Sequence, residues 1–389
     1  MRADLDLLCI SVYCTADDLL PPKQGNGRRK LTDAEIVTLC VAQVLMGVTS
    51  DRRFLRAARR QLGHLLPLLP SQDALHKRRQ RLADTIEWLI GVFVAQSPGS
   101  SDDLVLLDST PVECGRSLET TRRSDLADVC GYGYCKSHSR WFWGMRLHLL
   151  CAPDGTPRAA TLVSADRSER EVGLALLART LNGGETIVCD KGYAGREFEQ
   201  AVSELGGLIV RPARKDEPDS SVQLAPIRQR IESVFLTCKD LLSLERHGAR
   251  TTRNLRARIA TRLLALATCI QLNHHLGRPS RAIAIHRLTR WHQSSRPRAS
   301  RRPRRTRPPR VSRYRRPDCL AGRARAWSER VGLPRRDGHS LQYGRRDRRE
   351  RDRAGRRRLL RGRPAQLVPR RRRYLRNCAE RCHRLGAMV

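Results

Sequence analysis

Two aspartates stand at the ends of apolar runs that are typical of buried strands. Asp108 ends the run LVLLD at 104–108, and Asp190 ends TIVCD at 186–190. Functional groups of an open sheet gather where its strands end at their carboxyl edge. We therefore expect the two carboxylates to project from the same edge. Taken singly, each aspartate could instead cap the turn or helix that follows it.

A third acid stands in the stretch IRQRIESVFLTCKDLL, where Arg228, Glu232 and Lys239 have the positions i, i+4 and i+11. On an α-helix these three side chains fall within roughly 40° of one another. Apolar residues occupy the adjoining arc, which predicts that the helix packs on a sheet with Glu232 at the edge of the packed face. The alternative is an ordinary surface pair between Arg228 and Glu232. Three hard carboxylates can hold divalent cations and leave room for phosphate oxygens.

The elements that must position these residues lie in residues 100–277, where short Val-, Leu- and Ile-rich runs alternate with helical patterns. This alternation predicts an α/β domain, a sheet covered by helices. The expected strands are 104–108, 142–150, 158–163, 186–190 and 208–210. Helical spacing is found in SEREVGLALLART, in GREFEQAVSEL, from about Ala225, and in LRARIATRLLALATCIQLNHH.

Residues 1–95 are predicted to form a helical N-terminal domain. Thr32 with Glu35 three positions later has the spacing of a capping box at the start of an amphipathic helix. Further helical patterns cover Arg53 to Leu66 and Leu75 to Val94. The pattern fits a helix-turn-helix-like DNA-binding unit and equally a helical domain that only packs on the next one.

The catalytic region resembles the DDE transposases of bacterial insertion sequences, which have a ribonuclease-H-like fold. The resemblance rests on Asp108 in the first strand, the DKGY at 190–193 after the fourth, and the R-x3-E-x6-K spacing of Arg228, Glu232 and Lys239. Related families have a tyrosine three positions before that arginine, where this chain has Ala225. With LLDSTPV, CGRS, GYGYC and ERHG, residues 1–277 resemble in particular the insertion-sequence group numbered nine-eighty-two.

The resemblance implies a transposase that cleaves DNA and transfers strands at the ends of an insertion sequence. Asp108, Asp190 and Glu232 would be the catalytic metal ligands for two Mg²⁺ ions, which Mn²⁺ could replace. Lys239 would act in catalysis, and Lys239 and Arg228 would contact DNA phosphates. The implied partners are terminal inverted repeats, target DNA and a second copy of the chain in a homodimeric synaptic complex.

The net charge of +37 makes a polyanion the first partner to consider. Residues 278–389 hold 38 arginines, no lysine and seven acids, so this tail carries about +31 of that charge. Its low-complexity composition predicts disorder. A frameshifted or read-through end in a GC-rich gene explains an Arg-rich tail without lysine better than a selected domain does, and such a copy could be inactive.

No apolar run approaches the ~20 residues of a membrane span, and no export signal is visible, so we expect a cytoplasmic, nucleoid-associated protein without a membrane partner. The 13 cysteines lack paired zinc-module spacing, which favours buried reduced thiols over a zinc site. Cys130, Cys135, His138 and His148 form the tightest group. Two functions remain as alternatives: a ribonuclease-H-like nuclease without strand transfer, and a non-catalytic basic nucleic-acid-binding protein.

Overall fold

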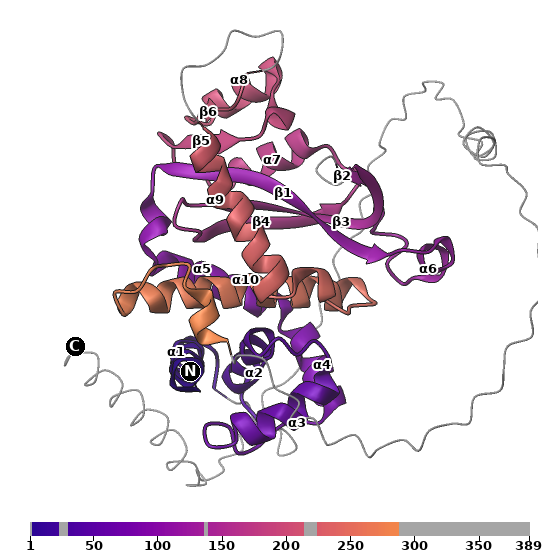
Figure 1. Ribbon diagram of the computed structural model, residues 1–389, viewed down its shortest axis with the longest axis vertical. Coiled ribbons are helices and arrows are strands. Elements are labelled where there is room, and N and C mark those ends of the chain that lie inside the picture. Colours follow the sequence, from indigo (N-terminus) through magenta and orange to yellow (C-terminus); the bar gives the residue numbers. More distant parts are fainter. Residues whose placement is uncertain (1, 23–29, 136–138, 214–223, 288–389) are drawn as a thin grey trace, which may run out of the picture. The chain divides into compact units, whose positions relative to one another are not determined.

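The computed structural model describes residues 2–22, 30–135, 139–213 and 224–287, which form a mixed α/β structure (Figure 1). Five α-helices of the described chain precede the first strand: α1 (Arg2–Leu19), α2 (Asp33–Leu45), α3 (Asp51–Gln61), α4 (Gln72–Arg81) and α5 (Ala83–Ala95). The strands are β1 (Leu104–Gly115), β2 (Gly131–Cys135), β3 (Arg140–Cys151), β4 (Pro157–Ser164), β5 (Thr186–Cys189) and β6 (Leu208–Val210). The later helices are α6 (Leu118–Arg123), α7 (Glu169–Leu177), α8 (Arg196–Glu204), α9 (Ala225–Leu236) and α10 (Thr252–His275). No helix among the described residues is long and apolar enough to cross a membrane.

The six strands form one mixed sheet in which β1 is central. The order is β2-β3-β1-β5-β6, and β4 also pairs with β3. The neighbours β3 and β1 are antiparallel, whereas β1, β5 and β6 run parallel to one another. The parallel register pairs Leu107 with Cys189, so Asp108 and Asp190 each follow a paired residue on adjacent strands.

Helices cover both faces of this sheet because the side chains of β1 alternate between two hydrophobic cores (Figure 1). Leu106 belongs to the larger core, which includes buried residues of α9, α10 and the N-terminal helices. Leu107 belongs to a smaller core with buried residues of α7 and α8. The sheet is therefore packed between helices on both faces. Asp108 and Asp190 directly follow the last residues that pair β1 with β5.

The helix α10 joins the N-terminal helices to the sheet. It is buried almost all round between Asn254 and Asn273, as expected for a helix with neighbours on every side. It packs against α5, α2, α4 and α1 on the helical side and against β4 of the sheet. The helical unit of residues 1–95 is thus continuous in packing with the sheet.

The capping box predicted at the start of α2 is confirmed. Thr32 accepts a hydrogen bond from the Glu35 backbone at 3.1 Å, and the Glu35 side chain accepts one from the Thr32 backbone at 2.8 Å. The helical pattern from Leu75 to Val94 is instead two helices, because Leu82 ends α4 and α5 begins anew at Ala83.

Two features of the sheet differ from the sequence prediction. The strand expected at 104–108 continues to Gly115, and β2 was not predicted. Beyond Asp108, β1 has lost its parallel neighbour β5 and pairs with β3 alone. Polar residues are tolerated on such a strand, so the apolar run ends earlier than the strand does.

Residues 278–287, which the sequence analysis placed in the tail, fold back on the helical unit. Arg278 forms an ion pair with Asp4 at 2.9 Å, and Ile283 is fully buried. The His286 ring lies 2.7 Å from the Asn273 side-chain oxygen. The rest of the expected tail, residues 288–389, lies outside the described residues.

Candidate active site

Asp108 lies where β1 and β5 part, and its carboxylate is held close to other charges. The backbone N–H of Ser109 donates to Asp108 Oδ1 at 2.7 Å. Burial raises the pKa of Asp108 to about 7, and the negative charges of Asp190 and Glu169 act in the same direction. The Ser109 hydrogen bond and the positive charge of Arg228 oppose this rise. A carboxylate with a raised pKa beside other acids is typical of functional sites.

Asp190 follows β5 directly and precedes a short turn of 3-10 helix, Lys191–Tyr193. Its side chain is 41% exposed and pairs with Arg228 of α9, with 3.1 Å between Nη2 and Oδ1. Tyr193 is buried beneath the turn, which anchors the chain after Asp190. The aspartate is thus fixed by its strand and by the turn, whereas its carboxylate remains accessible.

Glu232 reaches the same place from α9, which packs on the sheet through the buried Ile231. The Glu232 side chain is 60% exposed, and its Oε1 lies 4.0 Å from Arg228 Nη2. Asp108, Asp190 and Glu232 line one small pocket together with Arg228. The remaining wall of the pocket is formed by Leu106, Leu107, Val188, Cys189 and Ile231. The three acids selected from the sequence are therefore brought to one pocket.

The chemistry of these acids suits Mg²⁺, which prefers carboxylate oxygens. No group of three or more His, Cys, Asp or Glu side chains in the described part of the chain is arranged to hold a metal ion. The guanidinium of Arg228 instead bridges Asp190 and Glu232. The three carboxylates are thus gathered around one pocket, in which Arg228 contacts two of them.

Lys239 does not lie beside the acids, contrary to the helical stripe expected from its spacing. The α-helix ends at Leu236 and continues as a turn of π-helix, Thr237–Leu241. The wider turn changes the direction of later side chains, so an angle computed for an α-helix no longer holds. Lys239 Nζ lies 3.6 Å from Glu245 Oε1, and Lys239 is absent from the lining of the pocket.

A second polar group adjoins Asp108 on the other face of β1 and was not found from the sequence. The Ser109 hydroxyl donates to Glu169 Oε1 at 2.7 Å, and Arg146 of β3 forms an ion pair with the same carboxylate. Burial alone would raise the pKa of Glu169, but Arg146 and the Ser109 hydroxyl hold it below its usual value. Sequence spacing gave no signal here, because the group joins three separate elements.

The group of Cys130, Cys135, His138 and His148 is not assembled as a zinc site within the described residues. His138 itself lies outside them. His148 is fully buried, and neither ring nitrogen has a hydrogen-bond partner in the described chain. Burial lowers its pKa to about 4, so the ring is neutral.

Cys130 instead contacts Cys114, which occupies the irregular register between Glu113 and Gly115 of β1. A hydrogen bond from the Cys130 thiol lowers the pKa of Cys114 to about 6, with His247 acting in the same direction and burial opposing both. The same contact, together with burial, raises the pKa of Cys130. The contact therefore favours the thiolate form of Cys114 over that of Cys130.

Alkylation of Cys114 by iodoacetamide is expected to reach half its maximal rate near pH 6. Only the thiolate reacts, and an ordinary cysteine titrates near pH ~8.5. The rate can be followed by mass spectrometry of the peptide that carries Cys114. The variant Cys130→Ala should move the midpoint upward, whereas Cys130→Ser keeps a donor and should move it less. A midpoint near pH ~8.5 in the unchanged protein would show that Cys114 is an ordinary thiol.

Comparison with known proteins agrees with the resemblance seen in the sequence. Residues 99–268 match the family model described as "Transposase DDE domain". This segment is therefore similar to the DDE domain of transposases, and it contains Asp108, Asp190, Glu232 and Lys239. No curated protein matches the chain.

Among solved structures, the chain matches the cryo-EM structure of a piggyBac transposase synaptic complex with hairpin DNA. The two are 12% identical, with a TM-score of 0.38, and the match covers 73% of this chain and 77% of the other.

Proposed function

We propose that this chain is a DDE transposase that cleaves DNA at the ends of an insertion sequence and joins the freed ends to target DNA. One observation carries the proposal. The segment that matches the transposase DDE domain contains three acids from separate elements, Asp108, Asp190 and Glu232, and these line one pocket. Nuclease chemistry and strand transfer both need such a cluster beside the substrate phosphate.

The proposal extends to the fold and to the family subgroup. A ribonuclease-H-like fold is supported by the central strand β1, its antiparallel neighbour β3, its parallel neighbour β5 and the helices on both faces. The sequence motifs favour the insertion-sequence group numbered nine-eighty-two. The proposed domains are a helical unit at 1–95, a catalytic unit at 100–277 and an Arg-rich end that arises by frameshift or read-through.

In the proposed mechanism, Asp108, Asp190 and Glu232 hold two Mg²⁺ ions, for which Mn²⁺ can substitute. Bound there, the ions would lower the pKa of an attacking water and neutralise charge that develops on the phosphate. Arg228 balances Asp190 and Glu232 in the present arrangement. If bound cations balanced the charges of Asp190 and Glu232, the guanidinium of Arg228 would be free to bind a DNA phosphate. Lys239 would bind a second phosphate after leaving Glu245.

The proposed partners are the terminal inverted repeats, target DNA and a second copy of the chain that holds the other element end. The +37 net charge favours a polyanionic partner, although much of it lies in the tail. We place the protein in the cytoplasm at the nucleoid, where its DNA lies.

Detection of a joined DNA product distinguishes the transposase from a nuclease with the same acids. We expect the purified chain, with Mg²⁺ and a labelled DNA carrying the element end, to transfer the label covalently into an unlabelled target plasmid. Water competes with the DNA hydroxyl at the same site, so cleaved and joined products should depend on the metal together. Cleavage without any joined product would favour the nuclease, and neither product would favour the non-catalytic binding protein.

A further inference from the structure

Three arginines are buried together between the helical unit and α10, away from the carboxylate pocket. Arg79 of α4 is 2% exposed, and Arg258 and Arg262 of α10 are 8% and 3% exposed. The acid that contacts two of them, Arg79 and Arg258, in the described structure is Asp51, the first residue of α3. Buried arginines are rare unless each has a counter-charge.

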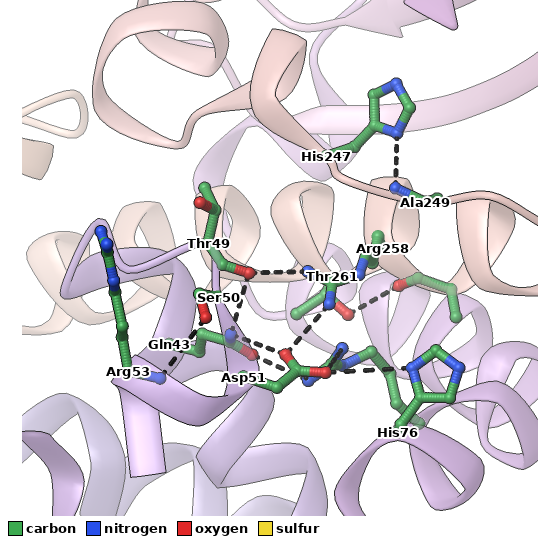
Figure 2. A network of polar contacts seen from close by, with 12 residues as sticks. Gln43, Thr49, Ser50, Asp51, Arg53, His76, His247, Ala249, Arg258 and Thr261 are labelled. Carbon is green, nitrogen blue, oxygen red and sulfur yellow. Dashed lines mark hydrogen bonds and ion pairs between the residues drawn. The ribbon is translucent and has the colours of Figure 1, made fainter. Parts of the chain in front are cut away.

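The carboxylate of Asp51 is fully engaged by two of the three arginines. Its Oδ1 accepts from Arg79 Nη2 and from Arg258 Nη2, each at 3.0 Å, and also from Gln43 at 2.9 Å. Its Oδ2 accepts from Arg79 Nη1 at 3.3 Å. Figure 2 shows Asp51 with its partners Gln43 and Arg258. One negative charge therefore serves two guanidinium groups and is not shared with the third.

Arg262 is held by neutral groups. It donates to the backbone oxygens of Ser243, Arg258 and Arg246 at 3.0, 2.7 and 3.4 Å. Burial and the positive charges of Arg258 and Arg79 lower its pKa to about 9, which is the effect of a missing counter-charge. The Arg258 Nε is also buried without a hydrogen-bond partner in the described chain. The cluster therefore has an excess of two positive charges.

A small pocket adjoins this cluster. It has a volume of about 20 Å³, and Arg79, Arg258 and Arg262 all line it. The lining also includes the loop Gly47, Val48 and Thr49, together with Ser243, which has a left-handed backbone with φ of 57°. A cavity of about 10–15 Å³ accommodates one water-sized group. The pocket thus admits a single small ion or one oxygen atom of a larger anion.

We propose that this pocket binds an anion, either a chloride ion or one oxygen of a phosphate group. The anion would supply part of the negative charge that Asp51 cannot provide and would receive hydrogen bonds from the guanidinium groups around it. Because the pocket lies between α2, α4 and α10, an anion there would also hold the helical unit against the sheet domain. The site is separate from the carboxylate pocket and does not depend on the proposed transposase activity.

Chloride binding can be tested with the full chain by two measurements at constant ionic strength, with gluconate as the replacing anion. We expect the melting temperature to rise by about 5 °C as chloride replaces gluconate, because a ligand that binds only the folded state stabilises it. The chlorine NMR line should broaden saturably as chloride exchanges with the site. Inorganic phosphate should raise the melting temperature in the same way.

The matched variants Val48→Asp and Val48→Asn separate this pocket from the other basic surfaces of the chain. Val48→Asp places a carboxylate at the pocket and should abolish the chloride-dependent part of both signals, whereas Val48→Asn adds a similar polar group without charge and should keep it. Arg262→Met gives an independent check and should also remove the effect. Equal chloride responses in the unchanged protein and Val48→Asp would overturn the proposal, as would a melting temperature that does not respond to either anion.

Added duplex DNA distinguishes the two sources of the anion. If a DNA phosphate occupies the pocket, DNA should displace chloride and remove the broadening that Val48→Asp also removes. If a free ion occupies it, that component should persist when DNA is bound. Both results support an anion site. A pocket that holds only water would instead show no chloride-dependent line broadening or change in melting temperature that Val48→Asp removes.

Discussion

Replacement of Asp190 by asparagine is expected to lower the rate of DNA cleavage at element ends by about 1000-fold or more. Asparagine keeps the shape of the side chain and removes the anionic oxygen that a divalent cation needs. Loss of several kcal/mol of charge stabilisation in the transition state corresponds to that factor. The measurement is a single-turnover assay with Mg²⁺ and labelled end DNA. Omission of Mg²⁺ should have an effect of the same size on the unchanged protein.

The folded state should tolerate this change. The ion pair between Asp190 and Arg228 is partly exposed, so its loss should shift the free energy of unfolding by less than about 1 kcal/mol. Asp103→Asn is the matched control, because Asp103 is an exposed aspartate at the opposite end of β1 and β5. It should cleave at the parental rate. If Asp190→Asn also cleaves at that rate, Asp190 is not a metal ligand.

The local parts of this fold were accessible from the sequence because they depend on neighbouring residues. The Thr32–Glu35 box depends on a spacing of three positions, and the structure has it. The apolar runs that end at Asp108 and Asp190 reflect burial on both faces of a parallel pair, which needs no knowledge of the partner strand. These two runs were enough to predict that Asp108 and Asp190 lie at the same edge of the sheet.

The rest depended on contacts between distant elements. The continuation of β1 to Gly115 requires β3 as a partner, and neither residue type nor period reveals such pairing. The π-helical turn that redirects Lys239 leaves no mark in the apolar pattern of the helix. Glu169 reaches Ser109 and Arg146 only through the packing of α7 on the sheet. The shared helix face of Arg228, Glu232 and Lys239 was therefore predictable only up to Leu236, where the regular α-helix α9 ends.

The same limit explains why Asp51 escaped notice, and its replacement should have the largest effect on stability. We expect Asp51→Ala to lower the free energy of unfolding by about 3–5 kcal/mol, because Arg79 and Arg258 would remain buried without their carboxylate. Asp51→Asn should cost nearly as much, since an amide keeps some hydrogen bonds and supplies no charge. Urea unfolding followed by circular dichroism would measure both variants.

The effect of pH gives this prediction a second signature. Burial alone would raise the pKa of Asp51, but Arg79, Arg258 and Gln43 hold it below its usual value. A carboxylate whose pKa is lower in the folded state stabilises the protein above its unfolded pKa of about 3.9. That stabilisation decreases as the pH falls through the folded pKa. The difference between the unchanged protein and Asp51→Ala should therefore be constant near neutral pH and shrink below about pH 4.

Asp84→Ala is the control for a surface ion pair. Asp84 is 76% exposed and pairs with the half-exposed Arg256 at 2.9 Å. Exposed pairs contribute little, so this variant should lose no more than about 1 kcal/mol. If Asp51→Ala is no more harmful than Asp84→Ala, Asp51 is not the counter-charge of the buried arginines. The packing of α10 against the helical unit would then have to rest on its apolar contacts alone.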